Sequence, residues 1–293
     1  MDLNVLRRRR ATGAAPKRRL LVNVINWLAL GIVLVTLVSA VFAPLLTDFD
    51  PNQASPVDRF LAWGEDGHLL GTDHIGRDLL TRLLFGARLV WIVGLSVSLL
   101  AIIVGGALGA MAGYIGGRTD DVVSRAADAV LAFPPLLLAL VLSAVMGPST
   151  RTGIIALAIV YTPLVVRVSR AAVIGERHLS YVDASRGLGN SEARTLIRHV
   201  FPNVGGALFV VGSVVVSRAI IVEASLSFLG AGTQPPTSNW GVMIAEVREL
   251  IFSKPGQVLL PAFVLSATVL SLNLVSDFLS DRIDPRHSQD GLA

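Results

Sequence analysis

The chain has 293 residues, of which 53% are hydrophobic and 16% charged, and it carries a formal net charge of +4. Such long apolar stretches exclude an ordinary soluble domain and indicate a polytopic membrane protein. Because cysteine is absent and the five histidines are scattered without ligand spacing, disulfides are excluded and no metal site is expected.

Six apolar runs are long enough to cross a bilayer, which takes about 20 predominantly apolar residues. They cover residues 20–46, 88–113, 128–147, 153–174, 203–226 and 257–279. Helices of this length satisfy their own backbone hydrogen bonds in lipid. We therefore predict an all-α protein with six transmembrane helices and both termini on the same side.

The distribution of charge predicts the orientation of these helices. Lysine and arginine are concentrated in residues 1–19 and in the loop at 175–203, whereas the segment 47–85 is acidic. By the positive-inside rule, both termini, including the tail 285–293, and the 175–203 loop are cytoplasmic. The first apolar run is longer than the h-region of a signal peptide, so residues 20–85 are interpreted as an uncleaved span followed by an extracytoplasmic segment.

Glycines and prolines mark special positions in two of the spans. Gly105, Gly109, Gly113 and Gly117 recur every four residues on one helical face. This spacing favours close helix packing in lipid, with a moving hinge as the alternative. Phe133-Pro134-Pro135 is expected to kink or interrupt the third span, because proline removes backbone donors. Both a static kink and a broken helix lining a cavity, with Pro134 on the translocation pathway, are compatible with this pattern.

The polar segment after the fourth span has the pattern of two short helices joined by a turn. Asp183 is expected in the first turn of one helix, and Gly189 allows the turn before Asn190 or Ser191 caps the next. Ala184 and Ser185 are expected to keep the surface flat for close approach of a partner. The spacing favours a docking element over a helix that merely lies on the lipid.

The second of these helices is predicted to be amphipathic. Leu196, Ile197, Val200 and Phe201 fall on one side, and Arg194 and Arg198 fall on the other. Pro202 is expected to end the helix where the fifth span begins.

Arg218 and Glu223 lie within the fifth span, where charges are costly and are therefore functional candidates. Five positions correspond to about 140° around a helix, so the two side chains do not face each other. Glu223 could meet a peptide amine and Arg218 a carboxylate in a pathway. The alternative is that both lie near the outer end and reach water.

The chain has no nucleotide site of its own and no catalytic constellation. A phosphate-binding loop needs Gly-Lys followed by Ser or Thr, and the only lysines, Lys17 and Lys254, follow Pro16 and Ser253. If ATP drives this protein, a separate subunit binds it. No cofactor and no nucleic acid partner are expected.

Four motifs together carry a resemblance to a known family. They are Tyr181–Gly189 (YVDASRGLG) running on to His199–Asn203 (HVFPN), Leu70–Leu80 (LGTDHIGRDLL), Gly113–Asp120 (GYIGGRTD), and Ser227–Gly232 (SFLGAG) followed by Pro235, Pro236, Trp240 and Gly241. The combination resembles the C-type permease of ABC importers for dipeptides, oligopeptides and nickel. It covers most of the chain from about residue 70 onward.

The resemblance implies a MetI-like fold of the type I ABC importers over residues 86–284 and an import function in the bacterial plasma (inner) membrane. Its implied partners are membrane lipid, a homologous B-type permease, a pair of ABC ATPases that bind ATP and Mg, and an extracytoplasmic substrate-binding protein. The 175–203 loop would be the EAA coupling loop that transmits ATPase closure to spans three to five, with the residues named next in contact with the ATPase. These are Asp183, Ala184, Ser185, Gly189, Arg194, His199 and Pro202.

Two further expectations concern positions at which the chain departs from the family's motif and the surface on which the binding protein docks. Asp183 and Ser185 stand where the family more often has Glu and Ala, which are small steric changes. On the outside, the binding protein is expected to dock on loops that contain Asp73, Arg77, Asp78 and Trp240.

The substrate is left open by the sequence. Peptide is the default, because the resemblance is broadest there, and nickel or another small solute is the alternative. A stand-alone secondary transporter or channel would need no ATPase, and the internal repeats typical of such proteins are not seen.

Overall fold

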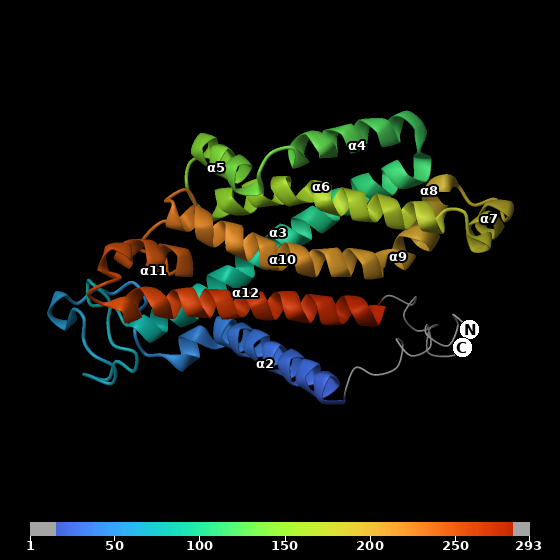
Figure 1. Ribbon diagram of the computed structural model, residues 1–293. Helices are drawn as coiled ribbons and strands as arrows, with labels where there is room; N and C mark the ends of the chain where they lie inside the picture. The colour runs from blue at the N-terminus through green and yellow to red at the C-terminus, as the bar shows by residue number, and fades with distance from the viewer. Residues whose placement is uncertain (1–15, 284–293) are drawn as a thin grey trace, which may run out of the picture.

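The computed structural model describes residues 16–283 and the side chains of residues 24–280. Within this range the chain forms helices joined by loops, without a β-sheet, as Figure 1 shows. The all-α prediction is therefore confirmed. The predicted tail 285–293 and the basic N-terminal segment, apart from residues 16–19, lie outside the described residues.

Five helices are long and apolar enough to cross a membrane. They are α2 (Pro16–Leu46), α3 (Leu79–Ile115), α6 (Thr150–Glu176), α10 (Gly205–Phe228) and α12 (Pro255–Ile283). They match five of the six predicted spans. Helix α3 begins well before the predicted start at residue 88 because Asp78 caps it, its Oδ1 accepting from the Thr81 backbone N–H at 2.7 Å.

The third predicted span, 128–147, is not one helix. Its place is taken by α4 (Gly117–Leu131) and α5 (Pro135–Met146), which meet at an angle of 89°. The expected interruption at Phe133-Pro134-Pro135 is confirmed, since Pro134 is extended and Pro135 opens α5. Helix α5 alone, with 12 residues, is too short to cross a bilayer. The described residues thus contain six spans only if the bent pair counts as one.

The remaining elements are short and lie at the two ends of the bundle. They are η1 (Pro56–Asp58), α7 (Ser180–Gly187), α8 (Glu192–Thr195), the π-helical turn η2 (Leu196–Val200), α9 (Phe201–Asn203), α11 (Trp240–Val247) and η3 (Arg248–Leu250). Helices α7 and α8 lie at one end, whereas α11 and the loop before α3 lie at the other (Figure 1). The start of α2 and the end of α12 both lie toward the α7 end of the bundle (Figure 1), in agreement with an even number of crossings.

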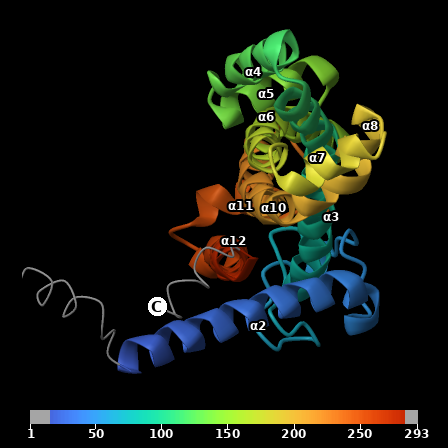
Figure 2. The same ribbon diagram turned by 90° about the vertical axis from the view of Figure 1, so that its right-hand side faces the viewer.

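The centre of the bundle is the contact between α3 and α6. A β-carbon on Gly105 or Gly113 would lie 2.7 Å from a backbone oxygen of α6, so the two backbones touch. The predicted close packing is thereby confirmed for Gly105, Gly109 and Gly113. It is wrong for Gly117, which begins α4 with φ +56° and has open space around it. In Figure 2, α2 lies along one edge of the bundle, with α4 and α5 at the opposite edge.

Candidate functional site

The segment between α6 and α10 folds back on itself as two short helical arms. Asp183 lies in the first turn of α7, and Gly189 makes the turn with φ +81°, a left-handed conformation that favours glycine. Ser191 then caps α8, because its hydroxyl accepts from the Arg194 backbone N–H at 3.3 Å. The helix, turn and cap predicted from the sequence are all present.

The two arms are held together by a buried polar contact. Ser185 Oγ lies 3.1 Å from Thr195 Oγ1, and Asn190 Nδ2 donates to Ser185 Oγ at 3.3 Å. Ser185 is buried, so its expected place on the exposed surface is wrong. Its hydroxyl joins the arms, while Asp183 and Ala184 are exposed beside it.

The second arm departs from a regular helix. After α8 the chain makes a π-helical turn, in which the Phe201 N–H donates to the Leu196 carbonyl. A π-turn accommodates one extra residue and rotates the positions that follow. Ile197, predicted on the apolar side, is 70% exposed, whereas Val200, predicted on the same side, is buried as expected, together with Thr195. Pro202 lies in α9, just ahead of α10, close to its predicted place.

Two exposed leucine and isoleucine side chains distinguish the tip of this segment. Leu188, beside the Gly189 turn, is 83% exposed, and Ile197 projects from the second arm. Arg194 and Arg198 are exposed nearby, and His199 is half-buried, with its carbonyl accepting from Asn203 Nδ2 at 3.0 Å. Exposed apolar side chains next to charged ones fit the protein contact that the sequence predicts for this segment. We call residues 175–203 the coupling loop.

The coupling loop is also tied to the end of α3. Tyr114 Oη donates to Glu192 Oε2 at 2.5 Å, and Arg186 Nη2 donates to Tyr114 Oη at 3.2 Å. The Tyr114 hydrogen bond, helped by the Arg186 charge, lowers the pKa of Glu192 although desolvation opposes the shift. Sequence reasoning missed this contact, because Tyr114 and Glu192 are 78 positions apart.

At the opposite end, a buried charge network joins the loop before α3 to α11. Asp73 Oδ2 accepts from Arg77 Nε at 2.7 Å and from Arg82 Nη1 at 2.6 Å. Glu246 Oε2 accepts from the same two guanidinium groups, at 2.7 and 2.8 Å. Burial raises the pKa of Asp73, but the backbone N–H groups of Arg77 and Ile75 and the two arginine charges outweigh it, so that the pKa is lowered.

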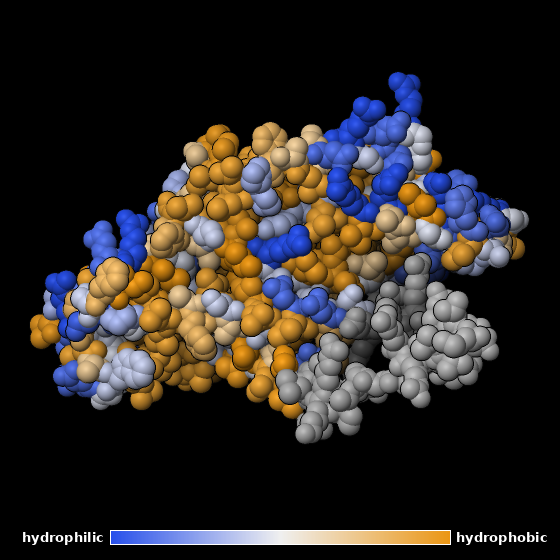
Figure 3. All heavy atoms as spheres, in the orientation of Figure 1, coloured by the Kyte–Doolittle hydropathy of each residue, from blue (hydrophilic) through white to orange (hydrophobic). Residues whose placement is uncertain are grey.

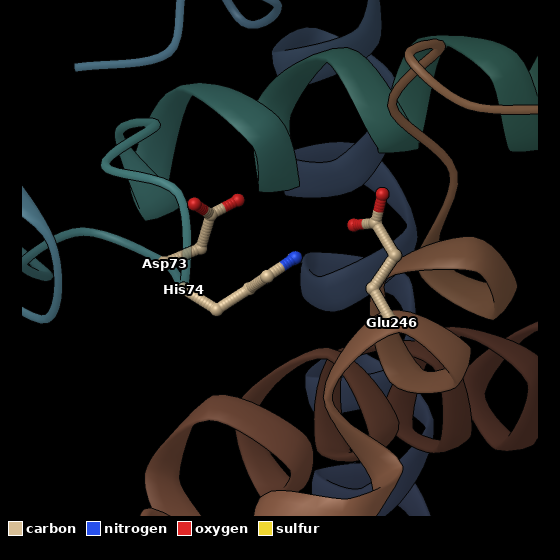
Figure 4. A group of neighbouring side chains, drawn as sticks. All are labelled: Asp73, His74 and Glu246. Carbon is tan, nitrogen blue, oxygen red and sulfur yellow. The ribbon is translucent and has the colours of Figure 1, made fainter. Parts of the chain in front are cut away.

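This network does not have the chemistry of a metal centre. Asp73, His74 and Glu246 each place a ligand atom within 4.8 Å of the others. Figure 4 shows how these three side chains lie next to one another. Two arginines already balance the charge of the two carboxylates, and a cation among them would be repelled. We interpret the group as a structural connection between the loop and α11.

The residues expected to dock a binding protein are largely buried. Asp73, Arg77, Asp78 and Trp240 are between 1% and 4% exposed. Asp78 also contacts His68 at 2.9 Å, and Trp240 Nε1 donates to the Leu83 carbonyl at 3.0 Å. Their side chains therefore hold the outer loops and α11 on α3 and form no contact surface of their own. Hydropathy and motif spacing do not indicate which polar loop residues fold inward.

Glu223 and Arg218 of α10 have opposite surroundings. The Glu223 carboxylate is buried and accepts from Ser227 Oγ at 2.7 Å, Thr233 Oγ1 at 2.9 Å and Asn239 Nδ2 at 2.8 Å. It therefore holds the loop between α10 and α11 and does not reach water. Arg218 is exposed, and among the described residues its guanidinium has no hydrogen-bond or ion-pair partner.

The surface around the long helices is mainly hydrophobic. Figure 3 shows a broad apolar band between hydrophilic ends, with a few hydrophilic side chains inside the band. One hydrophilic end holds the coupling loop, and the other holds the outer loops. Such a band fits a protein that crosses the membrane several times.

The fold and the apolar band define a multi-pass membrane protein, and comparison with known proteins identifies its family. Residues 105–289 match the model of the binding-protein-dependent transport system inner membrane component. The chain belongs to this family of transport permeases, which are membrane components and not enzymes.

Several relatives are similar over nearly the whole chain. A dipeptide transport system permease, DppC, of Escherichia coli K12 is 42% identical over 263 residues, covering 88% of this chain and 87% of the relative. A putative peptide transport system permease of Brucella abortus is 39% identical over 264 residues, covering 90% and 88%. A glutathione transport system permease, GsiD, of Pectobacterium atrosepticum is 34% identical over 254 residues, covering 87% and 84%.

Proposed function

We propose that this chain is the C-type permease subunit of an ATP-driven ABC importer that takes up dipeptides or oligopeptides across the bacterial plasma membrane. The observation that carries the proposal is the coupling loop, a pair of helical arms joined by the buried contact of Ser185 and Thr195, with Leu188 exposed at its tip. Relatives named for dipeptide, peptide and glutathione transport support a peptide cargo. A nickel or other small-solute cargo is the alternative outcome of an uptake assay.

The proposed complex contains a homologous B-type permease, a pair of ABC ATPase subunits and an extracytoplasmic substrate-binding protein. ATP and Mg are bound by the ATPases, because the chain has no phosphate-binding loop. Both termini and the coupling loop are proposed to lie in the cytoplasm, and the arginines of the loop support this orientation.

The contact with the ATPase is proposed to centre on Leu188. Asp183, Ala184 and Gly189 are exposed around it, and Ile197 and Arg194 extend the same surface along the second arm. Ser185, His199 and Pro202 act from inside by holding the arms in place. A small, well-packed apolar anchor surrounded by charge supplies both affinity and orientation.

The translocation pathway is proposed to pass the faces of α10 and of the broken helix pair at Pro134. Arg218 is the candidate contact in the pathway, because an exposed arginine in the membrane needs either water or an anion. Glu223 shapes the outer end of this pathway by holding the loop up to Asn239. The binding protein would contact the outer surface that Asp73, Arg77, Asp78 and Trp240 keep in place.

Transport is proposed to follow from two packings of the same bundle. Closure of the ATPases pushes the coupling loop and shifts the equilibrium between an outward-open and an inward-open arrangement. The loop can transmit this push because Ser185 and Thr195 lock its two arms into one unit.

The proposal is tested by purifying the tagged chain in mild detergent with its native partners. We expect a second permease and ATPases to co-purify with the wild type, and Leu188→Asp to lose the ATPases while keeping the permease. Phe252→Asp is the matched control, because Phe252 is 97% exposed at the opposite end of the bundle. A chain that never carries an ATPase overturns the proposal.

A further inference from the structure

We propose that Tyr114 fastens the coupling loop to α3, so that α3 moves with the loop and α6 as one body when the ATPases act. This inference rests on the proposed function and concerns how its movement is transmitted. The loop follows α6 directly in the chain, but only side-chain contacts connect it to α3. The resemblance implies movement of spans three to five, and the proposal adds the second span.

Tyr114 occupies the last turn of α3 and is almost completely buried. Its hydroxyl joins both arms of the loop, since it donates to Glu192 of α8 and accepts from Arg186 of α7. The Arg186 guanidinium also lies over the Tyr114 ring, 5.5 Å from the ring centre. One phenol therefore holds the end of α3 against both halves of the loop.

A second contact beside Tyr114 strengthens the connection. Arg177, which follows α6, donates from Nη1 to the Gly113 carbonyl at 2.8 Å. This carbonyl belongs to the last turn of α3, where backbone oxygens lack partners within the helix and carry partial negative charge. The arginine is therefore well placed both to satisfy the oxygen and to fix the end of the helix.

The packing between α3 and α6 resists sliding of one helix along the other, so that the two helices move together. Ser169 Oγ of α6 donates to the Gly106 carbonyl of α3 at 2.8 Å. With glycine backbones touching α6 above and below this bond, sliding would drive the two helices into each other. A movement of the loop is thereby transmitted to α3 along its whole contact with α6. Tyr114 keeps the last turn of α3 and the coupling loop together during this movement.

The first test compares Tyr114→Phe with Tyr161→Phe in the reconstituted transport complex. Tyr161 is a second buried tyrosine, whose hydroxyl donates to the Arg218 carbonyl at 3.3 Å, away from the loop. We expect Tyr114→Phe to lower the number of peptides imported per ATP hydrolysed by about threefold to tenfold, because the hydrogen bond to Glu192 is lost. The loss is limited to this range because Glu192 is exposed to water, where such a bond contributes only modestly. Tyr161→Phe is expected to leave this ratio unchanged.

A double-mutant cycle separates the connection from general loss of stability. If Tyr114 acts through Glu192, Glu192→Ala lowers the same ratio, and the double variant is no worse than the more severe single variant. Full additivity of the two changes, with unaltered thermal stability, overturns the proposal. An unchanged ratio in Tyr114→Phe also overturns it while leaving ATP-driven transport by the wild type intact, so the two proposals fail separately.

A distance measurement checks the rigid body directly. The chain has no native cysteine, so Ile115→Cys and Ala193→Cys introduce a unique pair of exposed sites for spin labels at the end of α3 and in α8. The label distance is expected to stay the same with and without ATP in the otherwise wild-type complex and to broaden in Tyr114→Phe. A distance that changes with nucleotide in the wild type contradicts the proposal.

Discussion

Gly109 of α3 faces the backbone carbonyl of Val166 in α6 so closely that a β-carbon on Gly109 would overlap that oxygen. The same β-carbon would also lie only 2.7 Å from Cβ of Ser169. Neither atom belongs to the free end of a flexible side chain. Any side chain at residue 109 therefore has to push the two central helices apart.

Gly109→Ala is expected to destabilise the protein by about 1–3 kcal/mol, as overpacking does in a tight core. Gly175→Ala is the control, because Gly175 lies in α6 with open space around it. There, alanine is expected to be neutral or to stabilise by about 0.5–1 kcal/mol through its helix propensity. Thermal unfolding in detergent measures both, and equal effects of the two substitutions would contradict the close contact.

Arg82→Met is expected to be the most destabilising change at the outer end. It removes one guanidinium from the buried network and leaves Asp73 and Glu246 with a single arginine between them. Breaking a buried ion pair costs about 3–5 kcal/mol. Adding Asp73→Asn is expected to recover part of the loss, because the uncompensated charge is removed. Arg151→Met, at an exposed arginine, should stay within about 0.5 kcal/mol of the wild type in thermal unfolding.

The same network predicts how stability depends on pH. The pKa of Asp73 is lower in the folded protein than its ordinary value of about 3.9. Its contribution is therefore fully present above pH of about 4 and is lost as the pH falls through the folded pKa. As the pH is lowered below about 4, the melting temperature should decline less steeply in Asp73→Asn than in the wild type. Asp48→Asn, an exposed acid of the same segment, serves as control, and identical slopes for both variants would count against the assignment.

Arg218→Gln tests the proposed pathway contact. With the complex assembled, we expect uptake of a peptide with a free carboxylate to fall about tenfold, the lower end for loss of a charged hydrogen bond. Arg218→Lys should retain part of the activity. Ile221→Gln is the control on the same exposed face of α10. Should Arg218→Gln instead release the partner permease, the arginine belongs to the subunit contact and not to the pathway.

Local patterns predicted much of the fold. Hydropathy located five spans, and the prolines at 134 and 135 predicted the break that separates α4 from α5. The caps and the glycine turn of the coupling loop also follow from local chemistry at Gly189 and Ser191. In each case, the interacting groups are neighbours in the chain.

Contacts between distant segments could not be predicted in the same way. Glu223 was identified as a costly charge, but its partners at Thr233 and Asn239 depend on how the following loop folds back. The burial of Trp240 depends on the place of α11 against α3. Regular helical periodicity misplaced Ile197, because the second arm contains a π-turn at this position, but it placed Val200 correctly on the buried side.

The most direct test of the account is peptide uptake by proteoliposomes that contain either this chain alone or the complete complex with its ATPases and binding protein. We predict uptake only by the complete complex, only with ATP, and its loss in Leu188→Asp. Uptake by the chain alone, driven by an ion gradient and indifferent to ATP, would contradict the account and indicate a secondary transporter.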